Sequence, residues 1–286
     1  MPAHDPDAGR AGVDLTHAFV PWSATLIAFD KLGNGNPVLF VHSGLADRHM
    51  WQPQLSTFAE RFTCYAIDLP GYGESSSPVE AFSYPAEIAA FIAETIGAAP
   101  ALVGSSFGAS QAFLTALVAP EWAGPLVLAN TAVLRPETTS PELEAVWTEA
   151  DAAWERGEHD RANEIEIEGW VDGKGRRPGQ AAGFVRDYFL GVNRSIWERH
   201  SANPLPDALP GPAIEPERIQ QPVLLIDGPY DFPDIRQSNA NLLARLPNAD
   251  YVSVPDTAHF PSYEQPEAFN RIVLEFLDRT WGANAT

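Results

Sequence analysis

Residues 100–108 read PALVGSSFG, an apolar run that ends in the pattern G-x-S-x-G. The apolar residues 101–103 predict a short buried strand, and the chain from Phe107 onward predicts a helix. Glycine at positions 104 and 108 lets the strand and the helix approach closely around a sharp turn at Ser106. A hydroxyl on such a turn stands exposed at a helix N-terminus, where backbone N–H groups can stabilise an oxyanion. The stretch therefore predicts that Ser106 is a nucleophile.

The composition is that of an acidic globular chain. Its 286 residues are enough for one α/β domain with an insertion. The 18 Lys and Arg against 38 Asp and Glu leave a formal net charge of −20, which argues against nucleic acid or an anionic membrane as a partner. The chain has a single cysteine, Cys64, no apolar run of about 18 residues, and no series typical of a secretory signal. We therefore expect a cytoplasmic protein without a membrane-spanning helix.

Apolar strands and helical patterns alternate along the chain. Continuous apolar runs indicate strands that are covered on both faces, as in a mostly parallel sheet. Helical periodicity follows at residues 88–96 and again at residues 269–277. The alternation predicts a doubly wound α/β sheet with its site at the C-terminal ends of the strands. The predicted strands are residues 24–30, 38–41, 62–67, 101–103, 126–128, 223–226 and 251–254.

Residues 135–217 interrupt this alternation and contain no convincing strand. They hold helical stretches at 141–155 and 158–170, followed by Pro- and Gly-rich sequence up to residue 216. The acidic run EIEIE at residues 164–168 alternates like a strand, but its helical neighbours favour a solvated helix face. We expect a helical cap inserted into a core domain. The predicted domains are residues 16–134 and 218–286 for the core, 135–217 for the cap, and 1–15 for a mobile N-terminus.

A serine nucleophile needs a base, and that base needs a carboxylate to orient it. His259 follows the last predicted strand in the segment PDTAHFP, which puts it on the same rim of the sheet as Ser106. Asp227, Asp231 and Asp234 all follow the strand at 223–226. Asp227 is too close to the strand, and Asp234 fits the first turn of a helix, where the dipole alone favours an acid. Asp231 follows a Gly-Pro turn that can aim its side chain at His259, so we favour Asp231.

Taken together, these segments resemble the α/β-hydrolase superfamily over residues 24–280. Residues 68–75, DLPGYGES, resemble its D-x-x-G-x-G-x-S loop, and the segments around Asp231 and His259, with Glu264 and Pro266, resemble its acid and histidine segments. The resemblance implies an eight-stranded, mostly parallel sheet with a helical cap and a triad of Ser106, His259 and Asp231. The layout is similar to the branch of enol-lactonases and small esterases.

The segment His42-Ser43-Gly44-Leu45 occupies the place of the superfamily's oxyanion loop. It departs from the pattern because Ser43, not glycine, follows the histidine. The resemblance implies that the backbone N–H of Gly44, or of Leu45, faces the oxyanion together with that of Phe107. It gives His42 no proton-transfer role, so we expect this histidine to brace the loop.

Aromatic and apolar residues near these loops are candidates for the substrate pocket. Each of them fits equally well in a packed core, because the sequence does not show which face a side chain covers. The candidates are Leu45, Trp51, Trp147, Trp170 and Phe260.

The nucleophile type narrows the chemistry. The resemblance implies Asp in place of Ser106 for haloalkane dehalogenases and epoxide hydrolases, so those activities are not expected. Asn130, where some relatives place their acid, carries no charge, which again favours Asp231. The leading interpretation is hydrolysis of a small-molecule carboxylic ester or lactone through an acyl-enzyme. Two alternatives remain: carbon–carbon bond hydrolysis of a ring-cleavage diketone, and a ligand-sensing protein with little turnover. No metal-ligand cluster or dinucleotide fingerprint is present, so neither metal nor cofactor is expected, and the oligomeric state is not readable.

Overall fold

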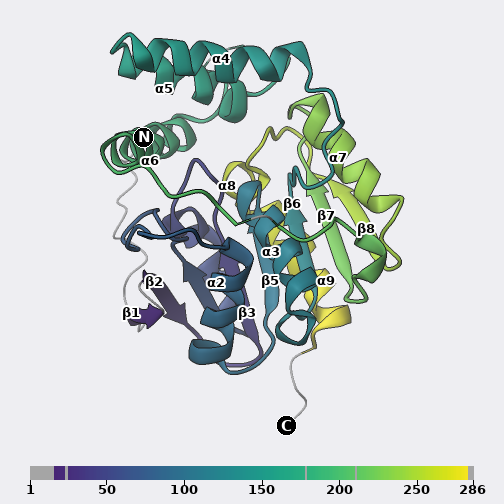
Figure 1. The fold of residues 1–286 in the computed structure, drawn as a ribbon. Helices are drawn as coiled ribbons and strands as arrows, with labels where there is room; N and C mark the ends of the chain where they lie inside the picture. Colours follow the sequence, from purple (N-terminus) through teal and green to yellow (C-terminus); the bar gives the residue numbers. More distant parts are fainter. Residues whose placement is uncertain (1–15, 23–24, 178, 210, 283–286) are drawn as a thin grey trace, which may run out of the picture.

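The computed structural model describes residues 16–22, 25–177, 179–209 and 211–282 (Figure 1). The expectation for residues 1–15 therefore lies outside the described residues. No helix in the described part is long and apolar enough to span a lipid bilayer.

A single eight-stranded sheet organises the described chain, in the order β1-β2-β4-β3-β5-β6-β7-β8. Strand β2 pairs antiparallel with both β1 and β4, and the other neighbouring strands pair in parallel. This confirms the predicted mostly parallel α/β sheet. Strand β1 lies in a segment for which the sequence patterns gave no strand. The strands are β1 (Thr16–Trp22), β2 (Thr25–Leu32), β3 (Pro37–Val41), β4 (Thr63–Ile67), β5 (Ala101–Ser105), β6 (Leu126–Ala129), β7 (Val223–Asp227) and β8 (Ala249–Ser253).

The central strand β3 shows why the strand sequences are continuously apolar. Val38 and Phe40 join one hydrophobic cluster, which includes side chains of α1 (Gln52–Phe58) and α9 (Pro266–Thr280). The alternate residues Leu39 and Val41 join a second cluster on the opposite face, with side chains of α2 (Tyr84–Phe91) and α3 (Phe107–Val118). Because both faces are covered, these four residues are buried whichever way their side chains point.

Cys64 on β4 belongs to this buried interior. Its thiol is fully buried, and burial raises the pKa of that thiol to about 12. A thiol that stays protonated at neutral pH is a poor nucleophile, so Cys64 acts as a small apolar core residue.

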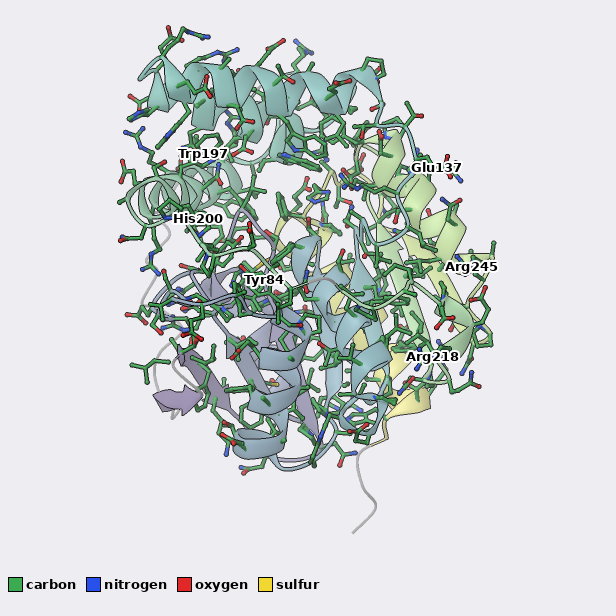
Figure 2. The ribbon with its side chains drawn as sticks, in the orientation of Figure 1. Tyr84, Glu137, Trp197, His200, Arg218 and Arg245 are labelled. Carbon is green, nitrogen blue, oxygen red and sulfur yellow. The ribbon has the colours of Figure 1, made fainter. Side chains whose placement is uncertain are left out.

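Residues between β6 and β7 form helices that lie over one end of the sheet (Figure 1). Helix α4 (Pro141–Glu155) has the predicted bounds, and α5 (His159–Ile167) continues into the π-helical turn η4 (Glu168–Asp172). The EIEIE run is therefore helical, as expected, but it is not a solvated face, because Ile165 and Ile167 are buried and the three glutamates are only partly exposed. A third helix, α6 (Gly183–Ala202), was not singled out by the sequence patterns. Trp197 and His200 lie on α6, above the segment that carries Tyr84 (Figure 2).

The remaining elements connect these parts. Short 3₁₀ turns and one further π-helical turn join strands to helices on the faces of the sheet. These turns are η1 (Arg48–Trp51), η2 (Ile92–Ile96), η3 (Pro120–Trp122) and η5 (Pro216–Arg218). Two further α-helices follow the last two strands: α7 (Pro233–Leu243) comes after β7, and α8 (Pro261–Glu264) comes after β8.

Candidate active site

Ser106 lies on the turn between β5 and α3, in a strained backbone conformation. Its φ is 54° and its ψ is −114°, outside the regions that a non-glycine residue readily adopts. A Cβ on Gly104 would lie 2.5 Å from the Cα of Ala109, and one on Gly108 would overlap the carbonyl oxygens of Val41 and His42. The two glycines therefore let α3 pack against β5 and β3 closely enough to hold the turn. Ser106 itself remains partly exposed.

A chain of hydrogen bonds joins Ser106 to His259 and Asp231. The Oγ of Ser106 lies 2.7 Å from Nε2 of His259, and Nδ1 of His259 lies 2.7 Å from Oδ2 of Asp231. When Nδ1–H donates to the carboxylate, Nε2 of the neutral ring is left to accept the serine proton. His259 and Asp231 are only 1% and 4% exposed, so water does not compete for these bonds. In this geometry a histidine can take the proton of the serine hydroxyl while a carboxylate orients the imidazole.

The two other candidate carboxylates point elsewhere. Both oxygens of Asp227 accept from the hydroxyl of Tyr251, at 2.9 Å each. Oδ1 of Asp234 accepts from the backbone N–H of Ser140 at 2.7 Å, at the start of α7. The structure thus brings Asp231 to His259 and leaves the other two in packing and capping positions.

Asn130 is a neighbour of Asp231 that sequence reasoning considered only for its lack of charge. Its Nδ2 donates to Oδ2 of Asp231 at 2.6 Å and contacts the carbonyl oxygen of Ala258 at 3.4 Å. Oδ1 of Asp231 accepts from the backbone N–H of Phe232 at 2.7 Å. These bonds fix the carboxylate in the plane in which it meets His259. The one available signal was position: Asn130 directly follows β6, the neighbour of β7, so its side chain reaches the acid loop.

The candidate oxyanion site lies between Gly44 and Phe107. A Cβ on Gly44 would lie 3.6 Å from the Cβ of Phe107, so the two segments are in contact. As the first residue of α3, Phe107 has an N–H without an acceptor in its own helix. The N–H of Leu45 is instead bonded to Oγ of Ser43 at 3.3 Å. Of the two alternatives for the loop donor, this geometry favours Gly44, and it gives Ser43 a role in the loop.

His42 braces the same loop from inside the protein. Its Nε2 accepts from the backbone N–H of Leu69 at 2.9 Å, and its Nδ1 lies 2.7 Å from the carbonyl oxygen of Ser43. Burial is the main cause that lowers the pKa of His42, so the ring is neutral and Nδ1–H donates to Ser43. The ring has no contact with Ser106 that would let it carry a proton there, in line with a bracing role.

The loop that follows β4 is held by Asp68. Oδ1 of Asp68 accepts from the backbone N–H of Arg48 at 2.7 Å, and Oδ2 pairs with the Arg48 guanidinium. Oγ of Ser75 donates to the Asp68 carbonyl at 2.7 Å. A Cβ on Gly73 would overlap the Asp68 carboxylate, which explains a glycine there. The Asp and Ser of the D-x-x-G-x-G-x-S pattern thus supply the hydrogen bonds that hold this loop closed, and its second glycine leaves room for the Asp68 carboxylate.

A family model described as the alpha/beta hydrolase family matches residues 38–272, which include Ser106, Asp231 and His259. The chain belongs to the α/β-hydrolase family.

Two curated relatives cover most of this α/β hydrolase. It is 29% identical over 279 residues to the putative non-heme bromoperoxidase BpoC of Mycobacterium tuberculosis, covering 88% of this chain and 97% of the relative. It is 28% identical over 251 residues to carboxylesterase YbfK of Bacillus subtilis, covering 84% and 79%. Among solved structures, the meta-cleavage product hydrolase CumD of Pseudomonas fluorescens IP01 superposes with a TM-score of 0.75 at 20% identity, covering 92% of this chain and 97% of that one. At that identity, the likeness concerns the fold alone.

The cap of this α/β hydrolase contacts the segment around His259 directly. The carbonyl oxygen of Trp170 accepts from the N–H of His259 at 3.3 Å, and the two rings lie 4.5 Å apart. Phe260 stacks on Phe189 of α6 at 4.0 Å. Two of the predicted pocket residues, Trp170 and Phe260, thus lie beside His259.

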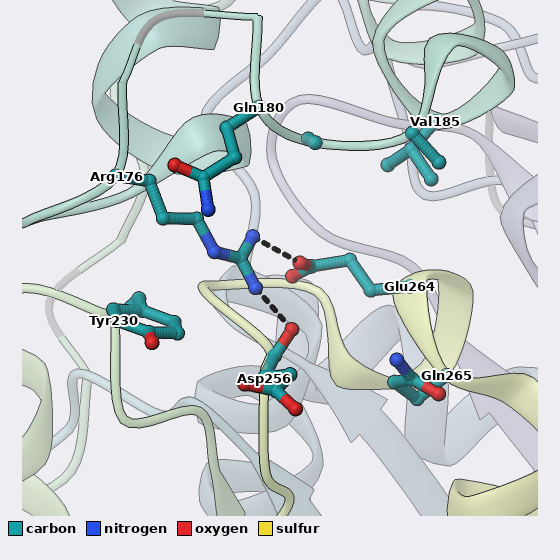
Figure 3. A pocket seen from close by; sticks show the side chains of 9 residues that line it. Arg176, Gln180, Val185, Tyr230, Asp256, Glu264 and Gln265 are labelled. Carbon is teal, nitrogen blue, oxygen red and sulfur yellow. Dashed lines mark hydrogen bonds and ion pairs between the residues drawn. The ribbon is translucent and has the colours of Figure 1, made fainter.

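An ion pair adds a second contact between cap and core (Figure 3). Nη1 of Arg176, in the loop before α6, lies 2.7 Å from Oε2 of Glu264, and both side chains are only 6% exposed. The other oxygen of Glu264 accepts from the N–H groups of Ala258 at 2.8 Å and Phe260 at 3.3 Å. These two residues flank His259, so the Arg176–Glu264 pair connects the cap to the segment that carries His259.

Backbone contacts reinforce this junction. The N–H of Lys174 donates to the carbonyl oxygen of Tyr230 at 2.6 Å. A Cβ on Gly173 would lie 2.5 Å from both that oxygen and the Cβ of Ala258, and Gly173 has a φ of 79°. Only glycine fits at this point of the chain.

The remaining pocket candidates have different surroundings. Leu45 lines a cavity together with Gly44. Trp147 is partly buried on α4, with the guanidinium of Arg135 5.4 Å above its ring. Trp51 corrects our expectation: it is fully buried between Phe40, at 5.2 Å, and Phe269, at 6.3 Å, and belongs to the core beneath the sheet. Within the described residues, no three His, Cys, Asp or Glu side chains gather in a way that could hold a metal ion.

Proposed function

We propose that the protein is a serine hydrolase that cleaves a small carboxylic ester or lactone through an acyl-enzyme. The observation that carries the proposal is the continuous bonding from Ser106 to His259 at 2.7 Å and from His259 to Asp231 at 2.7 Å. It starts from a partly exposed serine on a strained turn at a helix N-terminus. Oriented in this way, a serine hydroxyl becomes a nucleophile at neutral pH.

The chemistry proceeds in two halves. His259 takes the proton from Ser106 as the oxygen attacks the substrate carbonyl, and the N–H groups of Gly44 and Phe107 bind the oxyanion that forms. The imidazolium, stabilised by Asp231, then gives its proton to the leaving alkoxide. In a lactone this alkoxide stays attached to the acyl group. His259 next deprotonates a water molecule, which attacks the acyl-enzyme, releases the acid and restores the Ser106 hydroxyl.

The similarity to carboxylesterase YbfK supports ester hydrolysis, because that relative aligns over 84% of this chain. The buried, orienting environment of Asp231 supports turnover over simple binding, since a sensor needs no base aligned with a serine. The proposal includes a small-molecule substrate. It also includes a cytoplasmic location, in keeping with a single, free and buried cysteine.

Turnover assays test the proposal. The purified protein is assayed with p-nitrophenyl acetate and butyrate, with γ- and δ-lactones, and with a ring-cleavage diketone. The Ser106→Ala protein serves as the blank, and labelling by a fluorophosphonate reports an activated serine. Ester or lactone hydrolysis that is lost in the blank is the expected result. Cleavage of the diketone alone would assign carbon–carbon bond hydrolysis. Neither turnover nor labelling would favour a ligand sensor.

A further inference from the structure

A cavity of about 370 Å³ opens between the cap and the oxyanion loop. Its core wall includes Gly44, the proposed oxyanion donor, and Leu45. A substrate whose carbonyl oxygen is bound at Gly44 can therefore extend into this cavity. The cap wall comes from α5 and α6 and includes Glu166, Asn193, Trp197 and His200.

The polar centre of the cap wall is the carboxylate of Glu166. Its Oε2 accepts from Nδ2 of Asn193 at 2.7 Å and from Nε1 of Trp197 at 2.7 Å. The amide of Asn193 also donates to Oδ1 of Asn163 at 2.9 Å, which holds this donor in place. Both donors use the same carboxylate oxygen. Within the described part of the chain, Oε1 of Glu166 has no hydrogen-bond donor.

No cation of the described residues neutralises Glu166. The arginines of α6 have other partners: Arg186 pairs with Asp172 and Glu164, and Arg194 with Asp160 and Glu198. Arg199 donates to the backbone of the loop after β4. His200 on the same cavity is no substitute, because burial lowers its pKa and its Nε2 lies 3.1 Å from the carbonyl oxygen of Gly71.

A partly buried carboxylate without a cation is costly, because it loses water on one side and gains no opposite charge. Burial raises the pKa of Glu166, while the bonds from Asn193 and Trp197 act in the opposite direction. Both N–H groups bond to Oε2 and stabilise negative charge there, although burial outweighs them and the pKa of Glu166 is raised overall. The Glu166 carboxylate bears this free-energy cost beside a cavity and next to the oxyanion loop, which is typical of a group that binds a ligand.

We propose that this cavity is a subsite for a substrate portion that carries a primary ammonium group, with Oε1 of Glu166 as its acceptor. The inference rests on the proposed function, because it places the rest of that substrate at Ser106. The apolar side chains of Leu45 and Ile196 line the same cavity and suit a short methylene chain between the ammonium group and the ester. The ammonium group would supply the positive charge that the cap wall lacks.

Calorimetry on the Ser106→Ala protein tests the subsite without any turnover. The probes are hexylammonium, hexanol and hexanoate, which share a chain and differ in the end group. We expect hexylammonium to bind about tenfold more tightly than hexanol, the difference of one charge-assisted hydrogen bond, and hexanoate to bind most weakly. Adding Glu166→Gln should bring hexylammonium and hexanol to similar affinities. Glu149→Gln, which removes the same charge from an exposed position on α4, should leave the preference unchanged.

Three results would overturn the subsite. They are equal binding of the three probes, a preference that survives Glu166→Gln, and a loss of preference in Glu149→Gln as well. Hexanol binding as tightly as hexylammonium, with both dependent on Glu166, would replace the ammonium group by a hydroxyl. Thermal unfolding of each variant shows that the fold is kept. Because binding is measured without catalysis, these outcomes are independent of whether the wild-type protein hydrolyses esters.

Discussion

Asn130 and His259 meet the same oxygen of Asp231, at 2.6 Å and 2.7 Å. Asn130 takes a left-handed backbone conformation, with a φ of 52°, to bring its amide there. The Asp231 carboxylate is therefore oriented by two groups, the amide of Asn130 at the end of β6 and the imidazole of His259.

Replacing Asn130 by Ala should lower kcat about tenfold, the effect of one orienting hydrogen bond on a group that acts in the transition state. KM should change little, because Asn130 contacts Asp231 and not the proposed substrate position. Steady-state kinetics measure the changes in kcat and in KM separately. Asn239→Ala is the matched control, since Asn239 is also buried but bonds to the backbone of β7. An equal loss of kcat in both variants would show that the effect is structural.

Ser106→Ala should abolish ester turnover by several orders of magnitude while the protein stays folded. The hydroxyl is partly exposed and bonded to His259, so its loss removes little packing. Ser105→Ala is the control, because Ser105 is the buried neighbour and its Oγ has no hydrogen-bond partner. Burst kinetics with p-nitrophenyl acetate measure the result. Retention of more than a few per cent of kcat in pure Ser106→Ala protein would reject the nucleophile.

Asp231→Asn should reduce kcat by about 10⁴-fold, because Asn supports the wrong imidazole tautomer and cannot stabilise the imidazolium. Asp227→Asn and Asp234→Asn should keep most of the activity, since these carboxylates bond to Tyr251 and to the backbone of Ser140. Comparing kcat for the three variants checks the assignment. A crippled Asp234 variant with an active Asp231 variant would move the acid to residue 234.

Arg176→Met should lower the free energy of unfolding by about 3–5 kcal/mol, because it leaves the buried carboxylate of Glu264 without its partner. It should also lower kcat, since Glu264 holds the backbone on both sides of His259. Urea unfolding and kinetics measure the two effects. Arg161→Met, which breaks an exposed cap ion pair with Glu168, should do neither.

A second variant separates the charge of Glu264 from its bonds to the backbone. Adding Glu264→Gln to Arg176→Met removes the uncompensated charge, and the amide oxygen still accepts from Ala258 and Phe260. The double variant should recover part of the stability and of kcat. A double variant worse than Arg176→Met alone would contradict this account.

Glu87 should make stability depend on pH near neutrality. Burial raises the pKa of Glu87 to about 7, and its Oε2 is buried without a partner. A raised pKa means that the folded state holds the proton more tightly than the unfolded one. The contribution of Glu87 to the free energy of unfolding is therefore fully present below the pKa of this residue in the unfolded chain. It is lost as the pH rises through about 7. The stability gained by Glu87→Gln should grow between pH 5 and pH 8 in urea unfolding, whereas a constant difference would contradict the shift.

The parts predicted from sequence are those that local patterns specify. The G-x-S-x-G turn, the strand runs and the Gly-Pro turn before Asp231 are each specified within a few residues, so the mostly parallel sheet and the residues of the hydrogen-bonded chain could be predicted. The order of the strands in the sheet was not predicted. The bond from Asn130 to Asp231 was not predicted, because Asp231 is far along the chain and an amide side chain gives no signal of its own. Trp51 was ambiguous for the opposite reason, since an aromatic ring after a strand fits a pocket wall and a core equally well.

Helix α6 shows a further limit. Its sequence mixes Gly191, Asn193 and Ser195 with aromatic residues, because one face covers the core and the other lines cavities. The helical periodicity of apolar residues in α6 is therefore weak, because polar residues that line cavities interrupt it. Strand β1 pairs with β2 alone, at the edge of the sheet, where a continuous apolar run is not required.

The junction of Trp170, Gly173 and Arg176 with the histidine segment also bears on engineering. An exchange of the whole insertion would replace all the residues between β6 and β7. Here, part of that stretch holds the backbone around the base. A transplant that keeps residues 168–176 and exchanges only what precedes or follows them should retain catalysis, whereas exchanging the whole insertion would give a well-shaped pocket over a misaligned histidine.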